Sequence, residues 1–153
     1  MGWDQLKEAR RFNKALVRET KQLTETYLSL FMRKLAFDIL RGVMEKTPVD
    51  TGRARGSWRL TVGRASDWQG LKKGPDDKKP DGAEIVPIQG SGGDAKVIER
   101  ASAALAAMRP YQTIWITNNV PYILRLENGW SDQAPNGMVT LTLAEARTML
   151  GDI

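Results

Sequence analysis

Glu127 and Asp50 are the carboxylates of this sequence whose surroundings could suit acid–base chemistry. Glu127 is followed by Asn128-Gly129, a pair that indicates a turn. A glutamate that acts as a general acid in a carboxylate pair needs its partner at a defined distance. The candidates are Asp50 and Asp132, and the sequence places neither of them near Glu127. We therefore expect a structural role for Glu127, in which it pairs with one of three arginines, Arg53, Arg55 or Arg125.

The triplet Asp50-Thr51-Gly52 also matches the catalytic triplet of aspartic proteases, in which two aspartates share one proton. Here the triplet occurs once and follows a predicted long helix. A short polar side chain just after Pro48-Val49 suits the N-cap of a new helical turn. We interpret Asp50 as that cap, opening a turn that continues to Arg55.

Cysteine and histidine are both absent from the 153 residues. Their absence excludes disulfides, the usual zinc sites, thiol nucleophiles and any histidine-activated serine or cysteine. Carboxylate chemistry, a lysine nucleophile or a metal held by oxygen ligands remains open. We predict that the chain is not an enzyme and has no catalytic, metal-binding or cofactor-binding residues. We also expect no membrane span and no signal peptide, because no apolar run is long enough.

The net charge of +5 is unevenly distributed. Residues 1–59 carry 13 basic and 7 acidic side chains, whereas residues 111–153 carry 2 and 4. Five basic residues, spaced to lie on one face of a helix, form a basic stripe: Lys7, Arg11, Lys14, Arg18 and Lys21. This stripe could be a solvated face, or it could meet an acidic surface or DNA phosphates. Aromatic residues are sparse there, so a contact with DNA would be independent of sequence and sensitive to salt.

Residues 4–46 contain no proline and one glycine, Gly42, and their apolar spacing predicts a long helix. We expect a break near Thr24-Glu25-Thr26, because β-branched residues lower helix propensity. The first part has a thin apolar stripe and predicts an arm over residues 1–24 that packs on a neighbouring subunit. The second part predicts the core stripe Tyr27, Leu28, Phe31, Leu35 and Ile39, widened by Ala36, Leu40 and Val43.

Pro48 ends this helix, because proline disfavours helical geometry in the residue before it. The later pattern predicts strands over 57–63, 113–117 and 122–126, extended chain over 138–143, and helices over 94–108, capped by Asp94, and 144–150. Segment 65–94, rich in Gly, Pro, Asp and Lys, predicts a long inserted loop that could include an edge strand at 85–88. The fold class is α+β in a single domain over 1–153. In it, the long N-terminal helix packs on a small, mostly antiparallel sheet beside a second helix.

Five tryptophans are many for a chain of this length. Trp58 and Trp115 lie on predicted strands, and we expect both in the core. Trp68 and Trp130 lie in predicted loops. An aromatic side chain in a loop is a common interface anchor, and Trp130 is the strongest candidate for that role.

Two segments carry a resemblance to a known family. The first is Thr47-Pro48-Val49-Asp50-Thr51-Gly52-Arg53, directly after the long helix. The second begins at Pro121-Tyr122, continues through Leu126-Glu127-Asn128-Gly129 and ends in the run from Trp130 to Val139. In this order they resemble the tail-completion or neck proteins of tailed phages, which include minor tail components of the head–tail joining region. The resemblance spans residues 25–145, and segment 65–94 looks like an insertion within it.

The resemblance implies a ring, commonly of six copies, between the connector and the tail tube around the DNA channel. It implies connector or head-closure proteins and tail terminator or tail tube proteins as partners, and no membrane. The expected location is the neck of the virion, after synthesis in the host cytoplasm, with non-specific contact to packaged DNA as an option. It brings no catalytic residues, and the corner residues that it assigns to sheet geometry and subunit contacts are Pro48, Asp50, Thr51, Gly52, Arg53, Tyr122, Glu127 and Gly129. The alternative hypothesis is a small basic nucleic-acid-binding protein that acts through the basic stripe.

Overall fold

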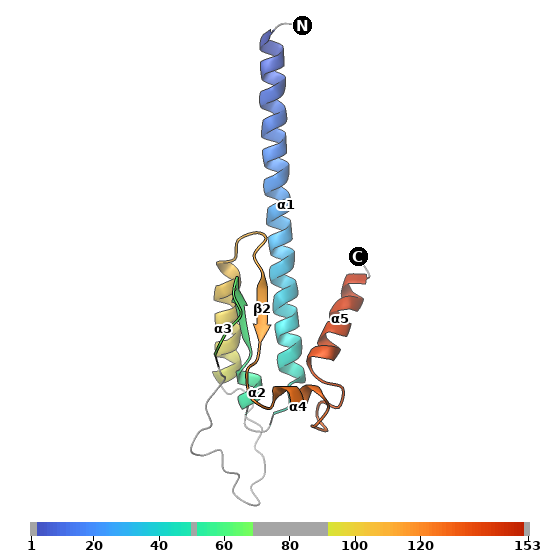
Figure 1. Ribbon diagram of the computed structural model, residues 1–153. Coiled ribbons are helices and arrows are strands. Elements are labelled where there is room, and N and C mark those ends of the chain that lie inside the picture. The colour runs from blue at the N-terminus through green and yellow to red at the C-terminus, as the bar shows by residue number, and fades with distance from the viewer. Residues whose placement is uncertain (1–2, 50–51, 69–91, 152–153) are drawn as a thin grey trace, which may run out of the picture.

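The computed structural model describes residues 3–49, 52–68 and 92–151. It confirms the α+β class, with a long N-terminal helix, a small antiparallel sheet and further helices (Figure 1). The helices are α1 (Trp3–Lys46), α2 (Arg53–Gly56), α3 (Gly92–Ala106), α4 (Ile123–Glu127) and α5 (Val139–Gly151), and the strands are β1 (Arg59–Val62) and β2 (Ile114–Thr117). Most of the predicted loop 65–94, with the edge strand suggested at 85–88, lies outside the described residues.

Helix α1 is a single unbroken helix of 44 residues, which makes it about 66 Å long at 1.5 Å per residue. The predicted break near Thr24 is therefore wrong. The hydroxyls of Thr24 and Thr26 donate to the carbonyl oxygens of Thr20 and Gln22 at 2.9 and 2.8 Å. These bonds are the ones that threonine makes inside a helix. In the described part of the chain, no helix is both long and apolar enough to cross a membrane.

Helix α1 consists of an exposed arm and a packed half. Between residues 4 and 28 no described side chain is buried, and the first buried residue is Ser29. Figure 1 shows the arm extending as a lone helix beyond all the other elements. The arm is thus slightly longer than the predicted segment 1–24, and we call residues 4–28 the arm from here on.

The packed half of α1 buries a different face from the predicted one. Ala36, Leu40 and Val43 are buried and join a core cluster with residues of α3, β1 and the segment before α5. Tyr27 and Phe31, which belong to the predicted core stripe, are 71% and 42% exposed. The prediction centred the apolar arc wrongly, because the residues that were expected to widen it are the ones that face the core.

Strands β1 and β2 pair antiparallel, with Leu60 opposite Ile116 and Thr61 opposite Trp115. Side chains alternate along a strand, so Trp58 and Leu60 share the face that packs on the core, as predicted. Trp115 lies on the opposite face beside Thr61 and is 42% exposed. Its predicted place in the core is therefore wrong.

Helix α3 contributes the buried residues Val97, Ala101, Leu105 and, just past its end, Met108. It begins at Gly92, so Asp94 lies within its first turn rather than at the predicted N-cap. Oδ2 of Asp94 is 2.9 Å from Nε of Arg55 in α2, a charge contact without the alignment of a hydrogen bond. The contact holds α2 against the start of α3.

Helix α5 packs beside the C-terminal part of α1 (Figure 1). A Cβ atom at Gly42 would lie 2.7 Å from Cγ2 of Thr142, so the missing side chain allows the two helices to approach closely. Nζ of Lys46 and Oε2 of Glu145 form an ion pair at 2.7 Å across the same interface. Two predictions fail in this region: residues 122–126 belong mostly to helix α4 rather than to a strand, and residues 138–143 lie in α5 or directly before it rather than in extended chain.

Candidate interaction surfaces

The two segments that carry the family resemblance lie against each other. The backbone N–H of Val49 donates to Oε1 of Gln133 at 3.1 Å. Directly beside the two segments, Nδ2 of Asn118 donates to the carbonyl oxygen of Ala54 at 2.7 Å. These contacts join positions 84 and 64 residues apart. The sequence predicted two corners but not their contact, because no local pattern identifies Gln133 or Asn118 as a long-range partner.

Arg53 and Tyr122, one from each segment, form a second link. Cζ of Arg53 lies 5.8 Å from the centroid of the Tyr122 ring, within the range of a cation–π contact. Both residues are half-buried. These two predicted motif residues therefore contact each other where the two segments meet.

Thr47 anchors the first segment to the end of α1. Its hydroxyl donates to the carbonyl oxygen of Val43 and accepts a bond from Nε1 of Trp58 at 2.9 Å. Thr47 and Trp58 are both buried, and a buried indole N–H needs such a partner. Pro48 follows directly, half-buried, where the helix has ended as predicted.

Gly52 occupies the N-cap position of α2, with a φ of 74° and no capping hydrogen bond from a side chain. The cap predicted for this turn was Asp50. Asp50 and Thr51 lie outside the described residues, so their predicted roles in the corner stay predictions.

Glu127 caps the N-terminus of α5. Its carboxylate accepts the backbone N–H groups of Met138, Val139 and Thr140, each at 2.9 Å, and the Thr140 hydroxyl at 2.8 Å. The first N–H groups of a helix have no partner within the helix, and the positive end of the helix dipole favours an anion there. One side chain of α4 thereby satisfies three backbone donors at the start of α5.

The same contacts determine the charge state of Glu127. Partial burial raises the pKa of this carboxyl, but the hydrogen bonds from Val139, Thr140 and Met138 lower it by more, so the pKa lies below its usual value. A carboxyl group with a lowered pKa is ionised at neutral pH and is poorly suited to donate a proton. The geometry supports the structural interpretation of Glu127 over the general-acid hypothesis.

The arginines predicted to pair with Glu127 contact other groups. Arg55 lies beside Asp94, as described above. Cζ of Arg125 lies 5.8 Å from the centroid of the Trp130 ring. The predicted ion pair is therefore wrong, because helix amides replace the arginine as partners of the carboxylate.

The backbone at position 129, in the second segment, requires a glycine. Its φ is 79°, and a Cβ atom there would lie 2.4 Å from the carbonyl oxygen of Pro135. Only glycine adopts such a φ without strain, and no side chain fits in the remaining space. The turn holds the run up to Met138 in place for capping by Glu127.

Trp130 lies in the loop after α4, as predicted, and is 78% exposed. An indole ring left in water and supported from one side by Arg125 can be buried by another protein. Its role as an interface anchor remains a prediction.

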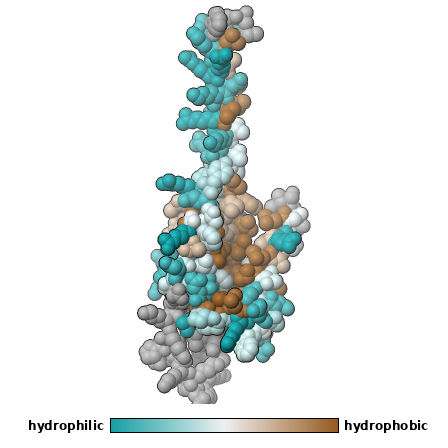
Figure 2. Space-filling model, viewed as in Figure 1, coloured by the Kyte–Doolittle hydropathy of each residue, from teal (hydrophilic) through white to brown (hydrophobic). Residues whose placement is uncertain are grey.

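The basic stripe lies on the arm, and all five of its side chains are exposed. Nζ of Lys7 lies 3.8 Å from Oδ1 of Asp4, and Nζ of Lys21 lies 3.8 Å from Oε1 of Glu25. Both ion pairs form between residues of the same helix. Figure 2 shows hydrophilic side chains along one edge of the arm and hydrophobic patches along the other. The arm therefore presents a charged surface and an apolar surface on opposite sides.

Large side chains make up the apolar surface of the arm. Phe12 is 67% exposed, and the others of this set are Leu6, Leu16, Val17, Leu23, Tyr27 and Leu28. Contiguous exposed apolar surface on this scale marks a contact with another molecule. The arm is therefore a candidate interaction surface.

No protein-family model matches the chain, and comparison with curated proteins and with solved structures finds no match either. Within the described residues, no group of three or more acidic side chains is placed to hold a metal ion.

Proposed function

We propose that this chain is a structural protein of a phage virion that completes the tail or neck at the head–tail junction. In this proposal it forms a ring between the connector and the tail tube, around the DNA channel. The observation that carries the proposal is the arm, a helix of residues 4–28 without a buried side chain. An isolated helix gains little stability from its backbone alone, so a long arm with apolar side chains is best explained by packing on another subunit.

The two motif segments support the same proposal. Their residues bond to each other and to helix ends, through Thr47, Arg53 and Glu127. Among the described residues, these contacts join the two segments into one corner at the C-terminal end of α1. A rigid corner of this kind suits a subunit that must hold its arm and the exposed Trp130 at fixed positions.

Removal of the gene from the phage genome tests this function. We expect lysates that contain filled heads and separate tails in electron micrographs, and joined particles again when the wild-type gene is supplied in trans. Normal joined particles in the absence of the protein would refute the proposal.

A second candidate function is non-specific binding of nucleic acid through the basic stripe. The observation in its favour is that all five basic side chains are exposed on one side of the arm. Such binding would weaken steeply as the salt concentration rises. The purified protein should then retard DNA of any sequence at low salt, and replacement of Arg11, Lys14 and Arg18 by glutamine should abolish the retardation. A wild-type protein that leaves DNA unretarded at low salt would exclude this function.

A further inference from the structure

The apolar surface of the arm follows a seven-residue repeat. With Leu6 at position a of a heptad abcdefg, the d positions hold Ala9, Leu16, Leu23 and Leu30. The a positions hold Leu6, Asn13, Thr20 and Tyr27. All four d positions are apolar, whereas the a positions are apolar at Leu6 and Tyr27 and polar at Asn13 and Thr20. An apolar d row with leucine in three of four heptads is typical of a coiled coil, and an asparagine at an a position is typical of one with a fixed number of strands.

No other part of the described structure covers this repeat. All eight side chains at a and d are exposed. Because α1 is one continuous helix, the arm cannot fold back on the rest of its own chain. Figure 1 shows most of the arm extending beyond the other elements, with the loop between α3 and β2 approaching its C-terminal part. Another molecule is therefore needed to bury the repeat.

The charges of the arm fit the same assignment. The residues of the basic stripe occupy b and f, the positions that a two-stranded coiled coil leaves in water: Lys7, Lys14 and Lys21 at b, Arg11 and Arg18 at f. The like charges of the basic stripe thus lie away from the repeat, and Arg10, at position e, is a basic residue that flanks it. This separation allows two identical arms to approach through their a and d faces.

We propose that the arm pairs with the arm of a second copy of this chain, as a parallel two-stranded coiled coil over residues 6–30. Asn13 would face Asn13 of the partner subunit, which fixes the register at some loss of stability. The proposal does not rest on a role in the virion, because the pairing is a property of the purified chain.

Residues at the flanking positions e and g determine the direction of the pair. In a parallel pair, position g of one helix faces position e of the next heptad in the other, so Phe12 meets Val17 of the partner subunit. These two side chains are 67% and 68% exposed in the single chain. In an antiparallel pair that buries the same a and d residues, Glu19 would face Glu19 of the partner subunit. Apolar contact in the first arrangement and charge repulsion in the second favour the parallel pair.

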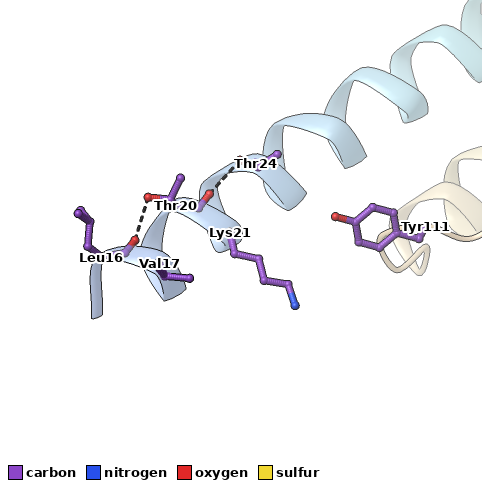
Figure 3. A pocket seen from close by; sticks show the side chains of 6 residues that line it. All are labelled: Leu16, Val17, Thr20, Lys21, Thr24 and Tyr111. Atoms are coloured by element: carbon purple, nitrogen blue, oxygen red, sulfur yellow. Dashed lines mark hydrogen bonds between the residues drawn. The ribbon is translucent and has the colours of Figure 1, made fainter. Parts of the chain in front are cut away.

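A surface pocket of about 400 Å³ lies along the e side of this repeat (Figure 3). Tyr111, from the loop between α3 and β2, faces the arm across this pocket. On the arm it is lined by two residues of the repeat, Leu16 and Thr20, and by Val17, Lys21 and Thr24. In the parallel pair, Phe12 of the partner subunit would lie along this pocket. At this pocket, Tyr111 of one copy would thus add to the contact between the two arms.

The mass of the full chain in solution tests the pairing. Sedimentation equilibrium at submillimolar concentration should give twice the 17.1 kDa of the single chain. The double variant Leu16→Lys/Leu23→Lys should give the single-chain mass, because it places charges in two d layers. Both side chains are exposed, so the far-UV circular dichroism and the melting of the core should be retained. The matched control, Arg11→Gln/Arg18→Gln, changes only f positions and should keep the doubled mass.

Disulfide trapping tests the direction in a chain that contains no natural cysteine. In a parallel pair, Ala9→Cys brings two thiols together at one d layer, and mild oxidation should convert most of the protein to a covalent dimer. The control Arg11→Cys, at an outward f position, should stay largely monomeric. A single-chain mass for the wild type at submillimolar concentration would overturn the pairing. Trapping of Ala9→Cys only in mixtures with Tyr27→Cys would overturn the parallel direction.

Discussion

Oε2 of Glu127 accepts the backbone N–H of Val139 at 2.9 Å, so a side chain from α4 caps the helix that begins 12 residues later in the chain. The bond explains what Glu127 does in the second motif segment, next to the run from Trp130 to Val139. Glu127 provides the acceptor, and Gly129 allows the turn that brings the amides to it. Glu127 and Gly129 are thus explained by the geometry of a helix start and a turn.

Replacing Glu127 by glutamine should lower stability. Glutamine keeps an oxygen acceptor but loses the charge that strengthens bonds to helix amides, so we expect a loss of about 1–2 kcal/mol in the free energy of unfolding. Urea unfolding at neutral pH and fixed protein concentration measures the difference. Glu99→Gln, at an exposed position of α3, is the matched control and should change stability by less than about 0.5 kcal/mol. Equal effects of the two variants would contradict the capping role.

The contribution of Glu127 should also depend on pH. Its pKa is lower in the folded protein than its ordinary value, so the folded state prefers the ionised form. The stabilisation is complete above the ordinary glutamate pKa of about 4.3 and is lost as the pH falls through the lower folded value. The difference in stability between wild type and Glu127→Gln should shrink through this acid range. A difference that grows on acidification would contradict the assignment.

Replacing Thr47 by valine should remove the acceptor for Nε1 of Trp58 without changing the shape of the side chain. A buried indole N–H left without a partner costs about 1–3 kcal/mol. Urea unfolding followed by tryptophan fluorescence measures this loss, and the near-ultraviolet circular dichroism of Trp58 should change as well. Thr148→Val, on the exposed side of α5, serves as the control and should leave both signals near those of the wild type.

Gly129→Ala should destabilise the protein more than Gly63→Ala. Both glycines have a positive φ, 79° and 85°, so both variants introduce backbone strain of about 1–2 kcal/mol. Only at Gly129 would the new Cβ atom also meet backbone, at 2.4 Å from the carbonyl oxygen of Pro135, whereas nothing lies within 4 Å at Gly63. The difference between the two melting temperatures isolates the contact. Identical decreases in melting temperature would show that the turn accommodates the new Cβ atom without any loss of stability.

Local patterns were sufficient to predict the elements that have strong periodicity. The bounds of α1 and the alternation of Trp58 and Leu60 follow from spacing and from Pro48 alone. They were not sufficient for α5, because its first residues, Val139 and Thr140, have side chains that favour strands. The cap from Glu127 lies outside any local window, and it supplies the partners that the start of this helix lacks.

Local patterns likewise predict some of the candidate surfaces and not others. The basic stripe is a repeat within one helix and is exposed as a single face. The joint between the two motif segments depends on Gln133 and Asn118, ordinary polar residues whose partners are far away in the chain. The face of α1 that enters the core is also determined by α3 and the sheet, which pack against it. The apolar spacing within α1 therefore predicts Tyr27 in the core, although this side chain is exposed.

The most direct test of the proposed function is where the protein lies in virions of a phage that encodes it. Image reconstruction of purified virions, with the wild-type chain and with a version tagged at its C-terminus, measures where the subunit lies. We expect several copies around the channel between connector and tail tube, with extra density from the tag at that level alone. Virions that lack the protein, or that carry it away from the head–tail junction, would refute the proposed function.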